Sequence, residues 1–427
     1  MKILFVVPCY PKRIREYLIL PSIELCIMSS VLKQRGHEIS LLDMQINDYK
    51  IDDIESLLRR YDPDLLCVED GLQVHCNSRK VLQAARKVYG DEIPLCIRGE
   101  IPSFVPQTTM ERNPELDIIL RYETDDTLLR VIDAMEGNLP LADIPDIAYR
   151  SRDGIVVTRR RETPLDLTKL PKADRRLYDI EKYLRRDSET IAKSSRGCVG
   201  SCAFCTKTRF ESYRQFPMFY FCDEIAELQS LGFRTFFFSD NIFAVTMDRL
   251  RNFQRELERR DLQVSWTSNI RIKDITDEKI ALMKKLGAYR VFIGIETINE
   301  SSSSLIHKNL RRQEILDKIE ILHRHQMEFH ASFILGSPGD TEADLQETIG
   351  FVHEIRPTLV TFNLLKVFPG LPIYDDPEAY GIVMPDKYWY ESDEWAGKVV
   401  MGTHTLPPEK LEKWSKKMLF SFVQAGG

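Results

Sequence analysis

The chain has 427 residues, of which 43% are hydrophobic and 29% charged. This composition is typical of a globular protein, and the length favours two or three domains. A formal net charge of −6 argues against a nucleic-acid partner, which would favour a basic surface. No apolar run approaches the roughly 20 residues of a membrane-spanning helix, and the run Met1–Pro8 is too short for a signal peptide. Nine cysteines without the spacing of a disulfide framework lead us to expect a cytoplasmic protein.

Residues 1–136 alternate short apolar runs with amphipathic stretches. The apolar runs, which we expect to be strands, are residues 3–7, 38–42, 64–68, 94–97 and 117–120. The amphipathic stretches, which we expect to be helices, are residues 21–35, 51–61, 78–89 and 127–136. This alternation predicts a doubly wound, Rossmann-like domain with a parallel sheet covered on both faces. Such sheets bind ligands beyond the carboxyl ends of their strands.

A different pattern occupies residues 137–190. Residues 147–150 and 155–158 flank the turn sequence Ser151-Arg-Asp-Gly154, which is typical of a β-hairpin. A stretch rich in proline, aspartate and arginine follows. We interpret the whole region as a hairpin and linker between two domains.

A second strand-helix series covers residues 191–374. The expected strands are residues 191–194, 235–239, 264–267, 290–295, 328–335 and 359–367. The expected helices are residues 217–231, 247–259, 277–286, 311–325 and 342–355. These make six units, fewer than the eight of a closed (β/α)8 barrel. Residues 375–427 form a short tail.

Three cysteines follow the first strand of the second series. Cys198, Cys202 and Cys205 have the spacing C-x3-C-x2-C. Three thiolates on one loop can bind three irons of a [4Fe–4S] cluster and leave the fourth iron open to a cofactor or substrate. Zinc is the main alternative, but structural zinc usually takes four ligands, and only Cys222 follows, with no histidine at a ligand spacing. The remaining cysteines include Cys9, Cys67 and Cys96, which we expect to be buried as small hydrophobic residues, because they lie in or beside apolar strands.

The cysteine run resembles the signature of the radical S-adenosylmethionine (SAM) enzymes, with Phe204 at their aromatic position before the third cysteine. The resemblance implies a partial (β/α)6 barrel whose open iron chelates SAM. It also implies that an electron from a reductant such as flavodoxin or ferredoxin cleaves SAM to a 5'-deoxyadenosyl radical.

Polar residues at the expected strand ends each have two interpretations. The resemblance implies that Asp240 and Asn241 accept hydrogen bonds from the SAM amino group, although they could simply cap the next segment. Glu296 suits the ribose diol, or a structural salt bridge. Arg271 suits the SAM carboxylate, or a surface salt bridge.

The domain order resembles the cobalamin-binding branch of this superfamily, as do residues 21–38 and the hairpin run Ile144–Gly154. This implies a corrin at the strand ends of the first domain, near Pro8, Tyr10, Asp70, Gly71 and Gly99. The sequence departs from the branch at the charged residues Glu69, Asp70, Arg98 and Glu100, and it has no Asp-x-His-x-x-Gly ligand motif. Those charges either reach corrin amides or pair with one another and close the site.

The resemblance implies cobalamin-dependent methyl transfer to an unactivated carbon of a small molecule. One alternative is a radical cyclase or rearrangement enzyme with a vestigial cobalamin domain, and another is a non-catalytic electron carrier or sensor. A methylthiotransferase would need three more clustered cysteines in the first domain, which the chain lacks. The sequence identifies neither the substrate nor a catalytic side chain.

Overall fold

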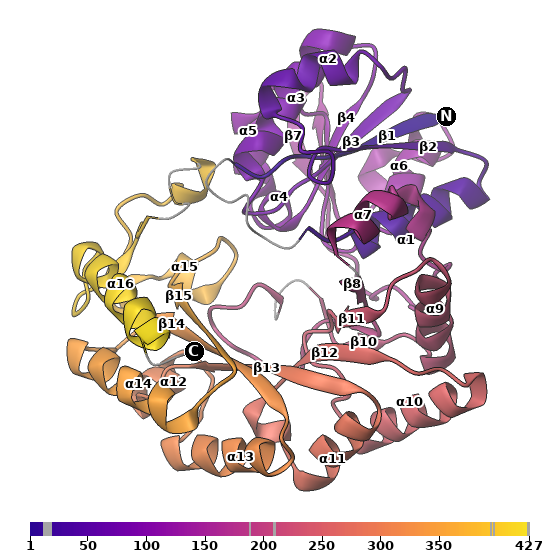
Figure 1. Ribbon diagram of the computed structural model, residues 1–427. Coiled ribbons are helices and arrows are strands. Elements are labelled where there is room, and N and C mark those ends of the chain that lie inside the picture. Colours follow the sequence, from indigo (N-terminus) through magenta and orange to yellow (C-terminus); the bar gives the residue numbers. More distant parts are fainter. Residues whose placement is uncertain (12–18, 188, 208–210, 393–394, 396–397, 425–427) are drawn as a thin grey trace. The chain divides into compact units, whose positions relative to one another are not determined.

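The computed structural model describes residues 1–11, 19–187, 189–207, 211–392, 395 and 398–424. The chain divides into two compact units (Figure 1). The first unit comprises Met1–Ser188 and Tyr390–Gly397, and the second comprises Glu189–Trp389 and Lys398–Gly427. The short segment Tyr390–Gly397 therefore belongs to the first unit, although the chain on both sides of it belongs to the second.

The first unit is built on a seven-stranded sheet with the order β2-β1-β3-β4-β5-β6-β7. Its five parallel strands are β1 (Lys2–Val7), β2 (Glu38–Asp43), β3 (Leu65–Glu69), β4 (Leu95–Arg98) and β5 (Ile118–Leu120). The predicted hairpin is present as β6 (Ile147–Ser151) and β7 (Gly154–Val157), and it extends this sheet in the antiparallel direction. The order reverses at β1, and ligands bind at such reversals in open α/β sheets.

Helices cover both faces of this sheet, because apolar residues alternate between the faces along each strand. Leu4 and Val6 of β1 pack under one set of helices, whereas Ile3 and Phe5 pack under the other. The helices of this unit are α1 (Ile23–Gln34), α2 (Ile54–Leu58), α3 (His75–Tyr89), α4 (Glu100–Phe104), α5 (Pro106–Arg112), α6 (Thr127–Met135) and α7 (Ile180–Arg186). Cys67 and Cys96 are buried in the core as expected, and Cys9 is half-buried.

The second unit contains a six-stranded, all-parallel sheet with the order β15-β14-β13-β12-β11-β8. Its strands are β8 (Glu189–Ala192), β11 (Thr235–Phe238), β12 (Ser265–Ile270), β13 (Ala288–Glu296), β14 (Glu328–Leu335) and β15 (Leu359–Leu364). Its helices are α9 (Met218–Ser230), α10 (Met247–Arg260), α11 (Asp277–Lys285), α12 (Glu300–Leu305), α13 (Arg312–Arg324), α14 (Glu342–Ile355), α15 (Pro372–Asp375) and α16 (Pro408–Gln424). Consecutive strands are neighbours and the sheet curls within a row of helices, so the predicted partial (β/α)6 barrel is confirmed (Figure 1).

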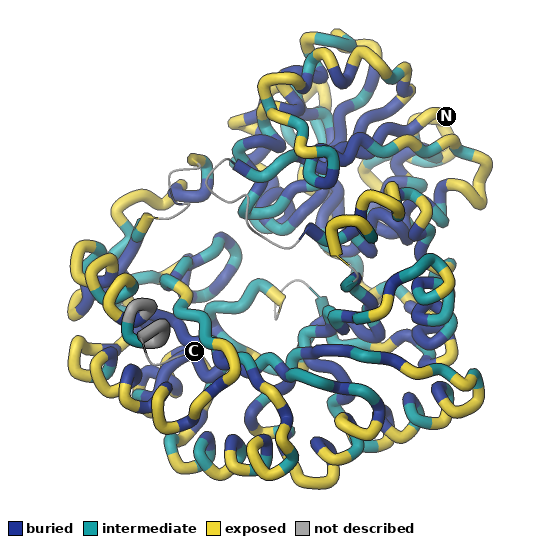
Figure 2. The backbone as a smooth tube through the Cα atoms, in the orientation of Figure 1, coloured by how far each residue is buried: buried dark blue, intermediate teal, exposed yellow. Residues whose placement is uncertain are grey.

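The strands of the partial barrel bury one side and leave the other half-exposed. On β11, Phe236 and Phe238 are fully buried, whereas Phe237 is half-buried. Buried and half-buried stretches occur along the backbone of this unit (Figure 2). Phe238 stacks on Trp266, with ring centroids 4.8 Å apart. The buried aromatic side fixes the sheet against its helices, and the half-exposed side is available to line a cavity.

The remaining strands are short. They are β9 (Ser195–Arg196) paired with β10 (Arg214–Gln215), and β16 (Ile382–Val383) paired with β17 (Gly402–Thr403). In the tail, Leu411 and Met418 of α16 pack on Leu345 and Ile349 of α14. Within the described residues, no helix combines the length and apolar character needed to cross a lipid bilayer.

Candidate active site

The three cysteines line one cavity of about 700 Å³ in the second unit. They follow β9, and Gly197 makes the turn that leads into them with a φ of 72°. A Cβ at Gly197 would lie 2.4 Å from the backbone carbon of Ser212, so only glycine fits. Phe204 also lines the cavity, beside Cys205.

The cysteine sulfurs lie close to a glycine that leaves room for them. The Gly200 N–H donates to Cys198 Sγ at 3.3 Å. A Cβ on Gly200 would lie 3.5 Å from Cys198 Sγ and 4.0 Å from Cys202 Sγ. Burial raises the pKa of the Cys202 thiol, and it raises that of Cys205 to about 11, so thiolate ligation depends on a bound metal.

This donor set fits a cluster better than a single ion. A single zinc ion in a structural site usually takes four ligands, whereas this loop supplies three cysteines. A cubane cluster needs only one thiolate at each of three separate irons. The three cysteines therefore suit the predicted [4Fe–4S] cluster.

Asp240, at the end of β11, holds the chain just before the cysteines. Its fully buried carboxylate accepts hydrogen bonds from the Ser194 N–H at 3.1 Å, from Ser194 Oγ at 2.9 Å and from Ser195 Oγ. Burial raises the pKa of Asp240, and the serine hydrogen bonds oppose that rise. These contacts hold residues 194 and 195 in place, and the predicted contact between Asp240 and the SAM amino group stays a prediction.

Asn241 lies beside Asp240 and lines the cavity. Its Nδ2 donates to the Gly197 carbonyl at 2.9 Å. The Asn269 Nδ2, on β12, donates to the Asp240 carbonyl at 2.9 Å. Residues at the ends of β11 and β12 thus stabilise, through hydrogen bonds, the turn that precedes Cys198.

Glu296 forms a partly buried ion pair on the cavity wall. It ends β13 with a φ of 70°, after an irregularity between Gly294 and Glu296. Its Oε1 lies 3.2 Å from Lys308 Nζ, and both residues line the cavity. Burial alone would lower the pKa of Lys308, but Glu296 and Cys202 outweigh it and raise the pKa. Sequence reasoning missed Lys308, because it lies in a loop without a motif.

Arg271 follows β12 and also lines the cavity. Asp274 binds its Nε at 2.7 Å and its Nη2 at 2.8 Å, and this pairing raises the pKa of Arg271. The salt bridge considered as an alternative is therefore present. A guanidinium has five N–H donors, so the Nη1 hydrogens remain available to a ligand.

A polar wall on β14 and β15 completes the cavity. His330 Nε2 is hydrogen-bonded to Thr361 Oγ1, and Asn363 Nδ2 donates to Ser332 Oγ at 2.9 Å. The Phe292 ring lies 5.0 Å from the His330 ring, and burial lowers the pKa of His330. Sequence reasoning missed this wall, although its polar residues alternate with apolar ones along both strands.

In the first unit, charged residues at the strand ends form ion pairs within the domain. Arg98 Nη1 lies 2.6 Å from Glu69 Oε1, which also accepts from Ser22 Oγ at 2.7 Å. Arg98 Nε donates to Thr124 Oγ1 at 2.9 Å, and Asp70 is bonded to His75 at 3.1 Å. Of the two outcomes considered for these charges, pairing with one another is seen for Glu69 and Arg98, whereas Asp70 pairs with His75.

The glycines at this edge have different roles. A Cβ on Gly99 would lie 2.3 Å from the Asp70 carbonyl oxygen, so Gly99 is needed for packing within the domain. A Cβ on Gly71 would meet no atom within 4 Å. Pro8 is buried, and Tyr10 and Gly71 are half-buried. The open space beside Gly71 leaves room at this edge for a bulky macrocycle such as a corrin to approach the backbone.

Two segments of the chain match known families. Residues 193–352 match the Radical SAM superfamily, and residues 16–132 match the B12 binding domain. An uncharacterized methyltransferase of Pyrococcus horikoshii is 22% identical over 382 residues, which cover 88% of this chain and 83% of the relative. An anaerobic magnesium-protoporphyrin IX monomethyl ester cyclase of Rubrivivax gelatinosus is 25% identical over 408 residues, covering 90% of this chain and 73% of the relative.

Solved structures share the fold. The radical SAM methyltransferase TsrM from Kitasatospora setae, with cobalamin and a [4Fe–4S] cluster bound, superposes with a TM-score of 0.78 at 15% identity. That match covers 99% of this chain and 88% of TsrM. The cobalamin-dependent SAM radical enzyme OxsB gives a TM-score of 0.75 at 17% identity, covering 88% of this chain and 60% of OxsB.

Proposed function

Because the chain belongs to the radical SAM superfamily and its first unit carries a B12-binding domain, we propose that it is a cobalamin-dependent methyltransferase that acts on an unactivated carbon of a small molecule. The observation that carries this proposal is the presence of both domains in one chain, with three cysteines on a single cavity. Relatives that are named as methyltransferases support it.

The cofactors of this family supply the radical and the methyl group, and the protein supplies binding and orientation. Cys198, Cys202 and Cys205 would hold the cluster. Asp240 and Asn241 keep their loop in place through the contacts described above. We assign the Glu296–Lys308 pair and Arg271 to SAM, because charged groups on the wall near the cysteines suit its charged amino-acid end.

The methyl acceptor would meet the polar wall of His330, Ser332, Thr361 and Asn363. These four side chains are neutral hydrogen-bonding groups, since burial disfavours the charged form of His330. They lie on β14 and β15, at the opposite end of the sheet from β8, which leads into the cysteine loop. The electron donor would be flavodoxin or ferredoxin, and nine cysteines without the spacing of a disulfide framework suit the cytoplasm.

A radical cyclase is the second candidate, because three relatives are anaerobic magnesium-protoporphyrin IX monomethyl ester cyclases. Both candidates cleave SAM reductively, but only methyl transfer moves a methyl group from SAM to the product. Product mass after incubation with SAM that carries a CD3 group therefore separates the two.

The test uses protein reconstituted anaerobically with iron, sulfide and cobalamin. We expect 5'-deoxyadenosine, S-adenosylhomocysteine and a CD3-labelled product when SAM, reductant and a metabolite extract are added. The variant with all three cysteines changed to alanine should form none of them. Deoxyadenosine without label transfer would favour the cyclase, and an intact cluster with no SAM cleavage would favour an electron carrier or sensor.

A further inference from the structure

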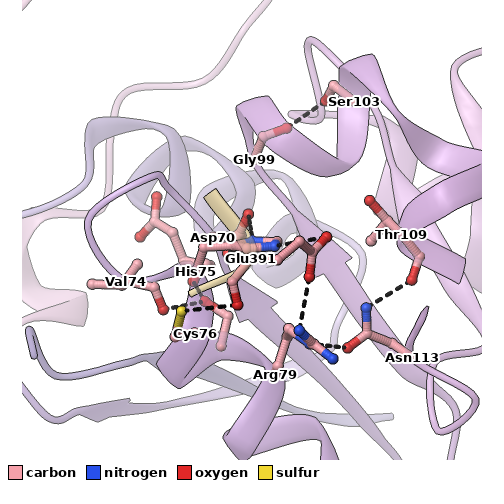
Figure 3. Close-up of polar contacts among 12 residues, drawn as sticks. Asp70, Val74, His75, Cys76, Arg79, Gly99, Ser103, Thr109, Asn113 and Glu391 are labelled. Atoms are coloured by element: carbon pink, nitrogen blue, oxygen red, sulfur yellow. Dashed lines mark hydrogen bonds and ion pairs between the residues drawn. The ribbon is translucent and has the colours of Figure 1, made fainter. Parts of the chain in front are cut away.

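A buried histidine in the first unit lies between two carboxylates that are far apart in the sequence (Figure 3). His75 Nδ1 is 3.1 Å from both carboxylate oxygens of Asp70. His75 Nε2 is 3.8 Å from Glu391 Oε1, with no hydrogen bond to any described residue. The exposed fractions of the side chains are 1% for His75, 0% for Asp70 and 9% for Glu391. We call this group the His75 cluster.

At its location, a positive charge on His75 would be unfavourable in free energy without the two carboxylates. His75 is the first residue of α3, where the helix dipole disfavours a positive charge. The helix has no acidic residue in its first turn and no side-chain cap. Burial alone would lower the pKa of His75, but Asp70 and Glu391 outweigh it and raise the pKa to about 9. The raised pKa favours the protonated histidine at neutral pH, and Asp70 and Glu391 compensate its charge.

The His75 cluster closes the loop between β3 and α3. Asp70 lies directly after β3, and its N–H donates to the Arg98 carbonyl at 2.7 Å. Within the loop, the Val74 N–H donates to the Gly71 carbonyl at 2.9 Å. The bond between Asp70 and His75 then joins the two ends of the loop. Gly71, which has open space beside it, lies inside this closed turn.

Glu391 belongs to the segment Tyr390–Gly397, which enters the first unit from the distant part of the chain. Its Oε2 is 2.7 Å from Arg79 Nη1, one turn further along α3. Arg79 is itself held by Asn113 Oδ1 at 3.1 Å. The Tyr390 ring packs edge-on against His75 at 5.9 Å. Glu391 is thus fixed by Arg79 with its second oxygen toward the buried histidine.

A protein with apolar residues of similar size in place of such a buried charged group is often at least as stable. A local positioning role explains why charges are used here: they fix a loop that apolar packing would leave free to shift. We propose that Glu391, acting through His75 and Asp70, positions the β3–α3 loop, residues 70–74, for cobalamin binding. This inference rests on the assignment of cobalamin to the first unit. Glu391 is a positioning residue and need not touch the cofactor.

The test compares Glu391→Gln with Glu55→Gln in the full-length protein. Glu391→Gln keeps the shape of the side chain and removes the charge facing His75. Glu55→Gln is the matched control, because Glu55 of α2 pairs with Lys87 of α3 at 3.3 Å, whereas its side chain is 44% exposed. Titration with methylcobalamin in the dark, followed by visible absorption, gives the dissociation constant. We expect at least tenfold weaker binding for Glu391→Gln and a change below twofold for Glu55→Gln.

A pH profile separates this role from a general loss of structure. The affinity of the wild type for methylcobalamin should fall as pH rises through about 9, where His75 loses its proton. Among the described residues, Asp70 and Glu391 are the anionic partners of His75, the Tyr390 ring packs against it, and Arg79 pairs with Glu391. His75→Gln should bind weakly at all pH values, with a flat profile. SAM binding by the second unit should be unchanged in both variants.

Equal methylcobalamin affinity in Glu391→Gln and wild type would overturn the inference. If the wild type itself binds no cobalamin, the proposed function fails separately, and hydrogen exchange then tests the loop directly. In that case, amides of residues 70–75 should exchange faster in Glu391→Gln than in Glu55→Gln. Identical exchange in the two variants would reject the positioning role.

Discussion

Gly294 and Glu296 lie two residues apart on β13, and a Cβ at position 294 would come within 2.2 Å of Glu296 Oε1. The same Cβ would lie 2.9 Å from Lys308 Nζ. The ion pair on the cavity wall therefore occupies space that exists only because residue 294 has no side chain. The positive φ of Glu296 adds to this local constraint.

Gly294→Ala should displace the Glu296–Lys308 pair and weaken SAM binding. Loss of one charge-assisted contact corresponds to about 1.5–3 kcal/mol, or roughly ten- to a hundredfold in affinity. Calorimetric titration of the reconstituted protein with SAM measures this effect. Gly350→Ala on α14 is the control, since a Cβ there meets no atom within 4 Å. Unchanged SAM affinity in Gly294→Ala would argue against a role for the pair in cofactor binding.

Cluster loading should depend on three cysteines alone. Changing Cys198, Cys202 and Cys205 to alanine should remove nearly all iron from protein reconstituted under anaerobic conditions. Cys222→Ala should keep its iron, because Cys222 is fully buried in α9 and does not line the cavity. Iron analysis and visible absorption test both statements. Iron retained by the triple variant would show that other ligands hold the cluster.

Asp240→Asn should reduce cluster loading more than it reduces SAM affinity. The amide cannot accept the Ser194 and Ser195 hydrogen bonds with both of its atoms, and a buried unsatisfied donor costs about 1–3 kcal/mol. We expect a lower melting temperature and less iron per chain, with near-normal SAM affinity for the loaded fraction. Asp248→Asn serves as the control, because the Asp248 side chain is 92% exposed. A full complement of iron with much weaker SAM binding would instead favour direct contact with the cofactor.

The His75 cluster predicts a pH dependence of stability. The pKa of His75 is about 9 in the folded state and 6.5 for a free histidine. Because the folded pKa is the higher, the contribution to the free energy of unfolding is fully present below pH 6.5 and is lost as pH rises through 9. A shift of this size corresponds to about 3 kcal/mol. The melting temperatures of wild type and His75→Gln, measured from pH 6 to 10, should converge at the alkaline end. A difference in melting temperature that stays constant with pH would contradict the assignment.

Local patterns were enough to predict the scaffold. The apolar alternation along β1 sends Leu4 and Ile3 to opposite faces of a parallel sheet, as expected for strands covered on both sides. The three cysteines could be recognised because their ligand spacing is contained in one short run. These features depend on residues near one another in the sequence.

Contacts between distant segments could not be predicted in this way. Arg79 and Glu391 are 312 residues apart, and no pattern in either segment indicates the other. Asp240 was placed correctly at a strand end, but its partners Ser194 and Ser195 depend on how β8 and β11 pair. For the charged residues at the strand ends of the first unit, the sequence left two arrangements open. The side-chain geometry of Glu69 and Arg98 shows that these two pair with each other.

The membership of Tyr390 and Glu391 in the first unit has a consequence for protein engineering. A fragment cut after residue 188 would retain His75 and Arg79 but lose the carboxylate and the ring that cover them. On the proposed role of Glu391, this fragment would bind cobalamin more weakly than the full chain does. Truncation alone therefore does not give a minimal corrin-binding module. The segment that holds Tyr390 and Glu391 would have to be added back, as a fused extension or by circular permutation.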